Sequence, residues 1–312
     1  MAVVKAAQAS LEPWSFGAGR FALAALAFAP ALPRALLSPS LRAASAELGL
    51  LAAAGYAAQG WGLTATSASH CAFISAFTVI LVPILAASGA LGRRGTVPPR
   101  TWAAAAIAVA GVAVLELTAG GSNEAASSLG GDAASLLAAA LFAAQLVRTE
   151  HHAARLGADD DADAAQPGEP SAAMALVAGQ LATLAACFAA GAVASAALAP
   201  PDISDWSVDG ALEAARALPW AAWLFTGLIS TAGTLWLEIE ALRDVSAPDA
   251  ALVYATEPVW GAAVAAAALG ERWAGPTWAG AALIVAGSLY GQLPAAQQEA
   301  KGEDAAAEAP PR

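Results

Sequence analysis

The ionisable residue with the most unusual setting in this sequence is Glu257, which lies inside an apolar run and directly precedes Pro258. Pro258 has no backbone N–H, so it leaves a carbonyl of the preceding helical turn without a partner. A carboxylate beside such a carbonyl could take up a proton or bind a cation, and carboxylates in apolar helices usually face a cavity or a partner. The alternative is architectural, with Glu257 bracing the helix break or pairing with Arg20.

Four other polar side chains lie in apolar runs: Arg20, Gln59, Gln145 and Gln180. Arg20 either faces a polar solute or extends its guanidinium group to the end of its helix. Each glutamine amide offers both donors and acceptors, so the three glutamines either contact a solute or hydrogen-bond to neighbouring helices.

The composition and its distribution indicate a membrane protein built from helices. The chain of 312 residues is 58% hydrophobic and only 12% charged, whereas a soluble domain carries about 25% charged residues. The apolar residues come in blocks of about 20, the length that crosses a bilayer as a helix. Pro, Gly or charged residues separate the blocks. We expect nine spans, at residues 16–32, 47–63, 68–91, 101–117, 132–147, 172–198, 217–237, 250–269 and 277–293.

Two stretches of the first half recur in the second half. Residues 102–111 (WAAAAIAVAG) align with 278–287 (WAGAALIVAG), and residues 67–74 (SASHCAFI) align with 246–253 (SAPDAALV). Internal repeats with broken helices in matching places are typical of secondary transporters.

The repeat adds candidates for a transport path. Phe73 and Tyr254 occupy nearly corresponding helices, and the ungapped alignment places Thr78 at the position of Glu257. Pro83 and Pro258 are expected to break corresponding helices at different depths. The expected path therefore comprises Arg20, Gln59, Phe73, Thr78, Gln145, Gln180, Tyr254 and Glu257.

Lys and Arg residues predict the orientation of the chain. Nine alternating spans place the C-terminal tail on the same side as the arginines at positions 34, 42, 93, 94, 100, 148, 155 and 243, so we expect that side to be inside. The count leaves Met1 outside, which suggests that one helix is missing before it. Glu116 is assigned to a helix end. Glu238 and Glu240 are assigned to a loop, because Arg243 and Asp244 follow them closely.

Several kinds of site have no support in the sequence. There is no basic patch for a nucleic acid and no Walker-type Gly-Lys-Ser/Thr motif for ATP. No Lys lies within a span, which disfavours exchange of phosphate esters. Cys71 and Cys187 are interpreted as helix-packing residues, and His151 and His152 as part of a solvated linker. We therefore expect no metal site and no cofactor.

The sequence resembles a known family at several motifs. Residues 62–85 (GLTATSASHCAFISAFTVILVPIL) resemble the third-to-fourth helix region of EamA-like transporters, in the drug/metabolite transporter superfamily. Residues 256–259 (TEPV) and 269–273 (LGERW) resemble their ninth helix and its exit, and residues 20–26 (RFALAAL) resemble the start of their second helix. Residues 148–151 (RTEH) are similar to the plant and algal branch. The resemblance implies ten helices in two inverted repeats of five, of which this sequence lacks the first helix.

The expected organisation follows. Residues 1–150 form a first repeat, 151–171 a flexible acidic linker, 172–293 a second repeat and 294–312 a disordered polar tail. The expected protein is an all-α, multi-pass membrane transporter or facilitator that moves a small organic metabolite by alternating access, and not an enzyme. A membrane-embedded hydrolase or acyltransferase and a non-transporting truncated remnant stay open as alternatives.

The expected partners are the lipid bilayer and a small-molecule substrate, and a homodimer is compatible with the sequence. The plastid envelope is one candidate location, since some members of the plant and algal branch look plastid-targeted. The plasma membrane or another cellular membrane is the alternative.

Overall fold

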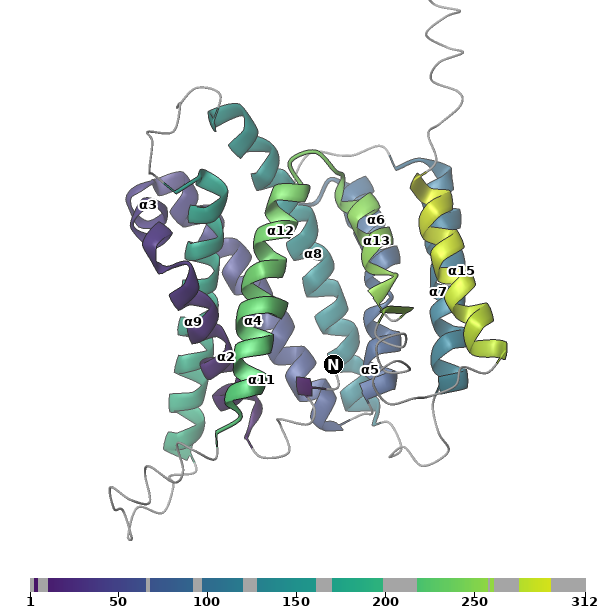
Figure 1. Cartoon of the computed structure of the whole chain (residues 1–312), viewed down its shortest axis with the longest axis horizontal. Coiled ribbons are helices and arrows are strands. Elements are labelled where there is room, and N and C mark those ends of the chain that lie inside the picture. The colour runs from purple at the N-terminus through teal and green to yellow at the C-terminus, as the bar shows by residue number, and fades with distance from the viewer. Residues whose placement is uncertain are drawn as a thin grey trace, which may run out of the picture.

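The computed structural model describes residues 3–4, 11–65, 68–91, 97–119, 128–160, 170–198, 218–257, 259–260 and 275–292. These residues are almost entirely helical and contain no strand, and their helices lie side by side (Figure 1). Within them, three helices are long and apolar enough to cross a membrane, at residues 129–156, 172–198 and 220–241, and one bent pair would make a fourth. The all-helical membrane class agrees with the sequence analysis, and the number of nine spans stays a prediction.

The first expected span is bent rather than straight. Helix α2 (Pro13–Ala27) ends at Phe28, and the chain turns by 63° into the short helices η1 (Ala29–Ala31) and α3 (Leu32–Leu37). Prolines 30 and 33 lie in this turn. Because each lacks an N–H, the helical hydrogen bonds cannot continue through it. The expected end at residue 32 therefore lies beyond the bend, at the first residue of α3.

Three long helices form the centre of the described structure. Helix α4 (Pro39–Ala65) packs against α8 (Leu129–Asp160) and α9 (Ala172–Leu198). Helix α9 has the bounds expected from the sequence. Helix α8 is longer than expected, because residues 151–160 continue it where a flexible linker was expected. Ala153 and Leu156 are buried there, and this packing explains why the helix continues. Residues 161–169 of the expected linker lie outside the described residues.

Two helices are interrupted at matching places of the sequence repeat. Helix α5 (Ala68–Ser75) is followed by a two-residue break and then by α6 (Thr78–Ser88). Helix α13 (Ala247–Tyr254) is followed by a two-residue break and a resumed turn at Glu257. In each break an amide N–H donates to the carbonyl three residues earlier instead of four. These hydrogen bonds run from Phe77 N to Ile74 O and from Thr256 N to Val253 O, and each is 3.0 Å long. The breaks also lie in one apolar cluster, which contains Ala76 and Ala255.

Helices α7 (Pro99–Ala119) and α15 (Gly275–Gln292) contain the aligned Trp-to-Gly segments and pack closely against each other. Gly111 lies against Gly280 and Ile284, whereas Gly287 lies against Ala104 and Ala108. Because later residues of α7 meet earlier residues of α15, the two helices run antiparallel.

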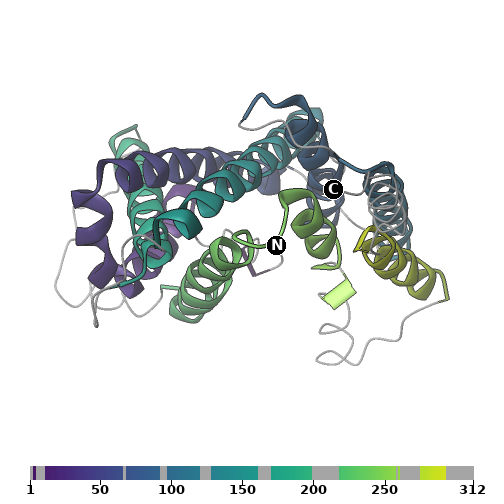
Figure 2. The ribbon, with the colours of Figure 1, turned by 90° about the horizontal axis from the view of Figure 1, so that it is seen from above.

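A segment of the second half crosses in front of the first-half helices. It consists of α11 (Trp220–Leu224), the π-helical segment η2 (Phe225–Gly233) and α12 (Thr234–Ala241). Figure 2 shows α12, α13 and α15 along one side of the molecule and α4 and α8 along the other. Wide π-helical turns inside α-helices are frequent at functional sites.

Candidate functional site

Arg20 is buried between helices rather than extended to a helix end. Its side chain is 7% exposed, and its Nε donates a hydrogen bond of 2.9 Å to the Thr231 hydroxyl. The guanidinium carbon lies 5.1 Å from the ring centre of Phe21 and 5.0 Å from that of Tyr56, which is the range of cation–π contacts. Thr231 belongs to the π-helical segment η2 and donates its own hydrogen to the Thr226 carbonyl. The wide turn therefore holds the hydroxyl oxygen towards Arg20.

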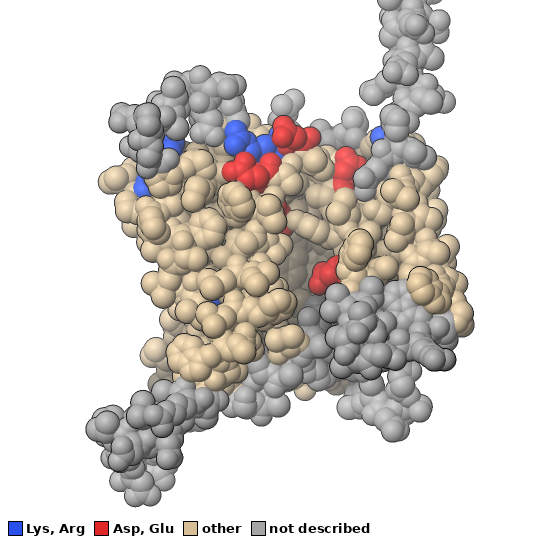
Figure 3. Space-filling view, in the orientation of Figure 1, with Lys and Arg blue, Asp and Glu red and all other residues tan. Residues whose placement is uncertain are grey.

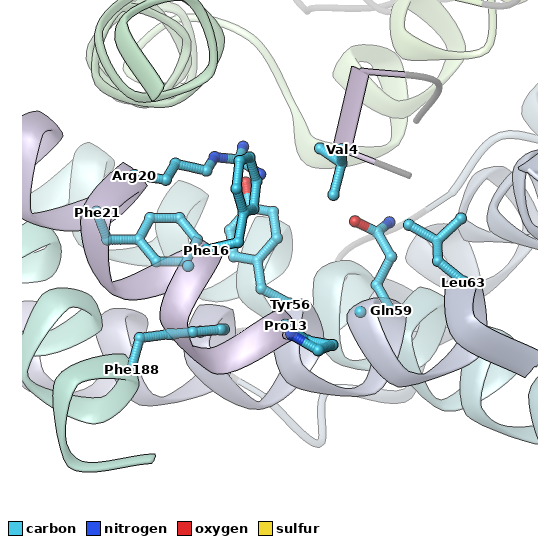
Figure 4. A pocket seen from close by; sticks show the side chains of 11 residues that line it. Val4, Pro13, Phe16, Arg20, Phe21, Tyr56, Gln59, Leu63 and Phe188 are labelled. Atoms are coloured by element: carbon cyan, nitrogen blue, oxygen red, sulfur yellow. The ribbon is translucent and has the colours of Figure 1, made fainter. Parts of the chain in front are cut away.

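Arg20 also lines a pocket with mainly apolar and aromatic walls (Figure 4). Its lining comprises Val4, Pro13, Phe16, Gly17, Arg20, Phe21, Tyr56, Gln59, Gly60, Leu63 and Phe188. Gln59 reaches it from α4, on the far side of the pocket from Arg20. Two of the expected path residues, Arg20 and Gln59, thus lie in one pocket and supply polar groups to it. Apolar walls with a few polar groups are typical of small-molecule sites.

Glu238 corrects the sequence interpretation, which assigned it to a loop. It lies in α12 and is only 8% exposed. Its Oε1 accepts a hydrogen bond of 2.9 Å from the Gln145 amide, and its Oε2 accepts one of 3.1 Å from the Tyr254 hydroxyl. The same amide nitrogen of Gln145 lies 3.1 Å from the Thr149 hydroxyl. The carboxylate therefore joins α8 of the first half to α12 and α13 of the second half.

Tyr56 connects the two groups of residues. Its ring centre lies 5.0 Å from the Arg20 guanidinium carbon, and Glu238 and Glu257 are acidic groups near enough to influence its ionisation. Glu257 itself is exposed, and no ion pair joins it to Arg20 in the described part of the chain. The face viewed in Figure 3 is hollowed in the middle, and acidic side chains line the hollow. The chemistry assembled here is one cation, two carboxylates and two phenols, which suits a small polar solute with an apolar body.

Three expected path residues lie outside this polar group. Phe73 packs against the apolar cluster and makes an edge contact with Phe77, with 5.7 Å between ring centres. The Thr78 hydroxyl donates a long bond of 3.4 Å to the Ala139 carbonyl. Gln180 is fully buried in α9, and neither its amide nitrogen nor its oxygen has a hydrogen-bond partner within the described residues.

The expected helix break at Pro83 is displaced. Pro83 lies inside α6, and the interruption is found at Ala76 and Phe77 instead. A proline ring disturbs the carbonyl four residues before it, here that of Val79, and the shortened turn immediately precedes that residue. Pro258 lies outside the described residues.

The sequence analysis missed Tyr56, Thr231 and Glu238. A signal existed for Glu238, because the apolar run continues through Trp236, Leu237 and Ile239 around it. Tyr56 could have been found because the chain contains only three tyrosines. The contact of Thr231 depends on the π-helical turn, which no sequence pattern indicated.

No metal centre emerges from the part of the chain that the structure describes, since no three His, Cys, Asp or Glu side chains converge there. The bidentate contact of Arg148 with Glu47, which His152 joins at 3.0 Å, lies between α4 and α8 and links helices of the first half only. The polar group around Arg20 and Glu238 is therefore the candidate site.

Comparisons with known proteins concern the family and the fold. The model of the EamA-like transporter family matches residues 172–290. One solved crystal structure of a protein has the same fold, with a TM-score of 0.68 at 16% sequence identity, and the match covers 96% of this chain and 93% of that one. No curated protein matches the chain.

Proposed function

We propose that this protein is a secondary transporter or facilitator that moves a small organic metabolite across a membrane, with its path between the two halves. The observations that carry this proposal are the buried contact of Gln145 with Glu238, at 2.9 Å, and the pocket that Arg20 and Gln59 line. Polar and ionisable groups inside a membrane bundle are costly, and they usually mark the route of a solute or ion. The match of residues 172–290 to the EamA-like transporter family supports a drug/metabolite type of transport.

We further propose that the halves are inverted repeats that alternate access to the site. The antiparallel contact of α7 with α15 supports this proposal, because aligned segments related by an axis in the membrane plane must run in opposite directions. The matched breaks after Ser75 and Tyr254 support it as well. Broken helices in corresponding places commonly form the substrate site of such transporters.

The proposal also covers which membrane holds the protein and which kind of solute it moves. The plant and algal resemblance makes the plastid envelope one candidate membrane, and the plasma membrane or another cellular membrane is the alternative. The site offers one guanidinium group and two carboxylates, so a solute with a single small polar end and an apolar body fits it better than a phosphate ester, which would need several cations.

The test is uptake by proteoliposomes that contain the purified full chain. A metabolite library is first screened for compounds that raise the thermal stability of the protein, since ligands that bind the folded state stabilise it. The compounds found are then measured in counterflow. Tyr254→Phe removes one hydroxyl from the site and keeps its ring, and it should lower the initial rate about tenfold, the equivalent of one hydrogen bond.

Tyr290→Phe is the matched control, because Tyr290 is exposed to a similar degree, 45% against 40% for Tyr254, but lies on α15, whereas the Tyr254 hydroxyl donates to Glu238. It should transport at the rate of the parent. Equal initial rates for Tyr254→Phe and Tyr290→Phe would show that the solute does not pass the region of Glu238. Absence of any counterflow with every stabilising compound would contradict the transporter function itself.

A further inference from the structure

The second-half segment from Trp220 to Ala241 is attached to the first half at three levels. Near one end, the Trp223 indole N–H donates to the Phe16 carbonyl at 2.9 Å. In the middle, Arg20 donates to Thr231. Near the other end, Gln145 donates to Glu238. In this last attachment the acceptor between the halves is a carboxylate, whose hydrogen bonding depends on whether it holds a proton.

The geometry around Glu238 fits the ionised carboxylate. Both of its oxygens accept, from the Gln145 amide at 2.9 Å and from the Tyr254 hydroxyl at 3.1 Å. The Gln145 nitrogen can only donate, so a proton on Glu238 has to sit on the oxygen that faces Tyr254. Tyr254 must then turn its hydrogen away. The bond to Gln145 also becomes a bond between neutral groups, which is roughly half as strong as a charge-assisted one.

No cation pairs with Glu238 among the described residues. Of the elements around it, α8 contributes the neutral Gln145 and Thr149, α13 contributes Tyr254 and, after its break, Glu257, and α4 contributes Tyr56. Helix α9, which packs against α12, contains no acidic or basic residue. Arg20 on α2 is bonded to Thr231. Glu240, which lies on α12 like Glu238, pairs with Arg243. Neutral donors therefore stabilise the charge of Glu238.

We propose that Glu238 is a proton-binding site that controls the contact between the two halves. Ionised Glu238 holds α12 to α8. A proton taken up from water on one side of the membrane loosens this contact. When the two halves have moved and opened the site to the other side, the proton is released to the water there. The inference rests on the proposed transport function and adds its coupling ion, so solute movement becomes proton-coupled.

The experiment needs no substrate and measures the contact directly. Cys71 and Cys187 are replaced by Ala, and spin labels are attached at Ala154→Cys on α8 and Leu237→Cys on α12, both exposed positions. Distances between the labels are measured by pulsed electron paramagnetic resonance in nanodiscs, between about pH 4 and about pH 8, a range that includes the ordinary pKa of a Glu side chain, about 4.3, and the higher values found at buried positions. The ratio of two distance populations should change about tenfold, a usual size for coupling between sites.

Glu238→Gln places a neutral amide where the protonated acid would be. Its distance distribution should be the same at both pH values and should match the parent at low pH. Glu240→Gln, two residues along the same helix, should titrate like the parent. A parent distribution that does not change with pH, or a Glu238→Gln variant that still titrates, would overturn the proposal.

Two further outcomes separate the possible failures. Loss of the pH response in Glu257→Gln but not in Glu238→Gln would place the proton site at Glu257 and overturn the assignment to Glu238. A pH-dependent distance without counterflow of any solute would leave the proton site in place and contradict the transport function. Counterflow without a pH-dependent distance would support the transport function and overturn the proton site at Glu238.

Discussion

Gly111 of α7 and Gly287 of α15 meet each other's helix in the same way. A Cβ atom at Gly111 would lie 2.7 Å from the Ile284 nitrogen, and one at Gly287 would lie 2.9 Å from the Ala108 nitrogen. Carbonyl oxygens lie equally close to each, 2.9 Å from the Cβ position. The two glycines are aligned in the sequence repeat, and so are the residues that they contact. The close approach of the two backbones thus depends on glycine at both positions.

We expect Gly111→Ala and Gly287→Ala to destabilise the protein by similar amounts, about 1–3 kcal/mol each, because the added methyl group meets backbone atoms that cannot turn aside. Gly275→Ala is the matched control, since nothing lies within 4 Å of its Cβ position. It should be neutral or slightly stabilising. Thermal unfolding of the purified variants in detergent measures this, and an unchanged midpoint for Gly111→Ala would contradict the packing of α7 on α15.

Thr231→Val should destabilise the protein through Arg20. The substitution keeps the shape of the side chain but leaves the buried Nε–H of Arg20 without its acceptor, which costs about 1–3 kcal/mol. Thr234→Val is the control, because Thr234 is exposed and its hydroxyl makes only a long bond of 3.4 Å to Ile229. It should change the unfolding free energy by less than about 0.5 kcal/mol. Equal unfolding midpoints for the two variants would show that Thr231 does not hold Arg20.

Much of the helical framework could be predicted from the sequence, because apolar blocks and their breaks mark where helices run. Arg20, Gln145 and Tyr254 were selected as polar or aromatic groups in apolar runs, and the structure brings each of them to the candidate site. Phe73 was selected on the same grounds but packs in the apolar cluster. Side-chain type alone does not tell which face of a helix a residue occupies.

The neighbours of Glu238 along the chain gave conflicting signals, because an apolar run continues through Trp236, Leu237 and Ile239 around it. Arg243 and Asp244 follow it closely, and local charge suggested a loop. The decisive partners, Gln145 and Tyr254, lie 93 and 16 residues away in the sequence. The break at Ala76 and Phe77 was missed for a related reason. Pro83 predicts a disturbed helical turn, but the position of the interruption also depends on how α6 packs against α13.

The charge distribution predicts the topology of the chain. Most of the Arg side chains visible in Figure 3 lie along its upper edge, and such residues favour the inner side of a membrane. We expect a tag inserted in residues 161–169 and a tag after Arg312 to be protected from protease on the same side, and a tag in residues 199–217 to lie on the other. Opposite locations for the first two tags would contradict the count of nine spans.

Arg148→Lys should loosen the attachment of α4 to α8. The Arg148 guanidinium contacts both carboxylate oxygens of Glu47, with Nη2 at 2.8 Å from Oε2, and its Nη1 donates to the Leu91 carbonyl at 2.7 Å. Lysine keeps the charge but cannot reproduce this planar fork.

The expected loss of unfolding free energy is about 1–2 kcal/mol, at the low end for charged hydrogen bonds, because the Glu47 side chain is 38% exposed and solvent weakens the pair. Arg243→Lys is the control, since its pair with Glu240 joins residues three apart on one stretch of chain. It should cost no more than about 0.5 kcal/mol. Thermal unfolding at low and high salt measures both variants. A loss in Arg148→Lys no larger than in Arg243→Lys would mean that simple charge attraction, rather than the forked contact between α4 and α8, accounts for the interaction.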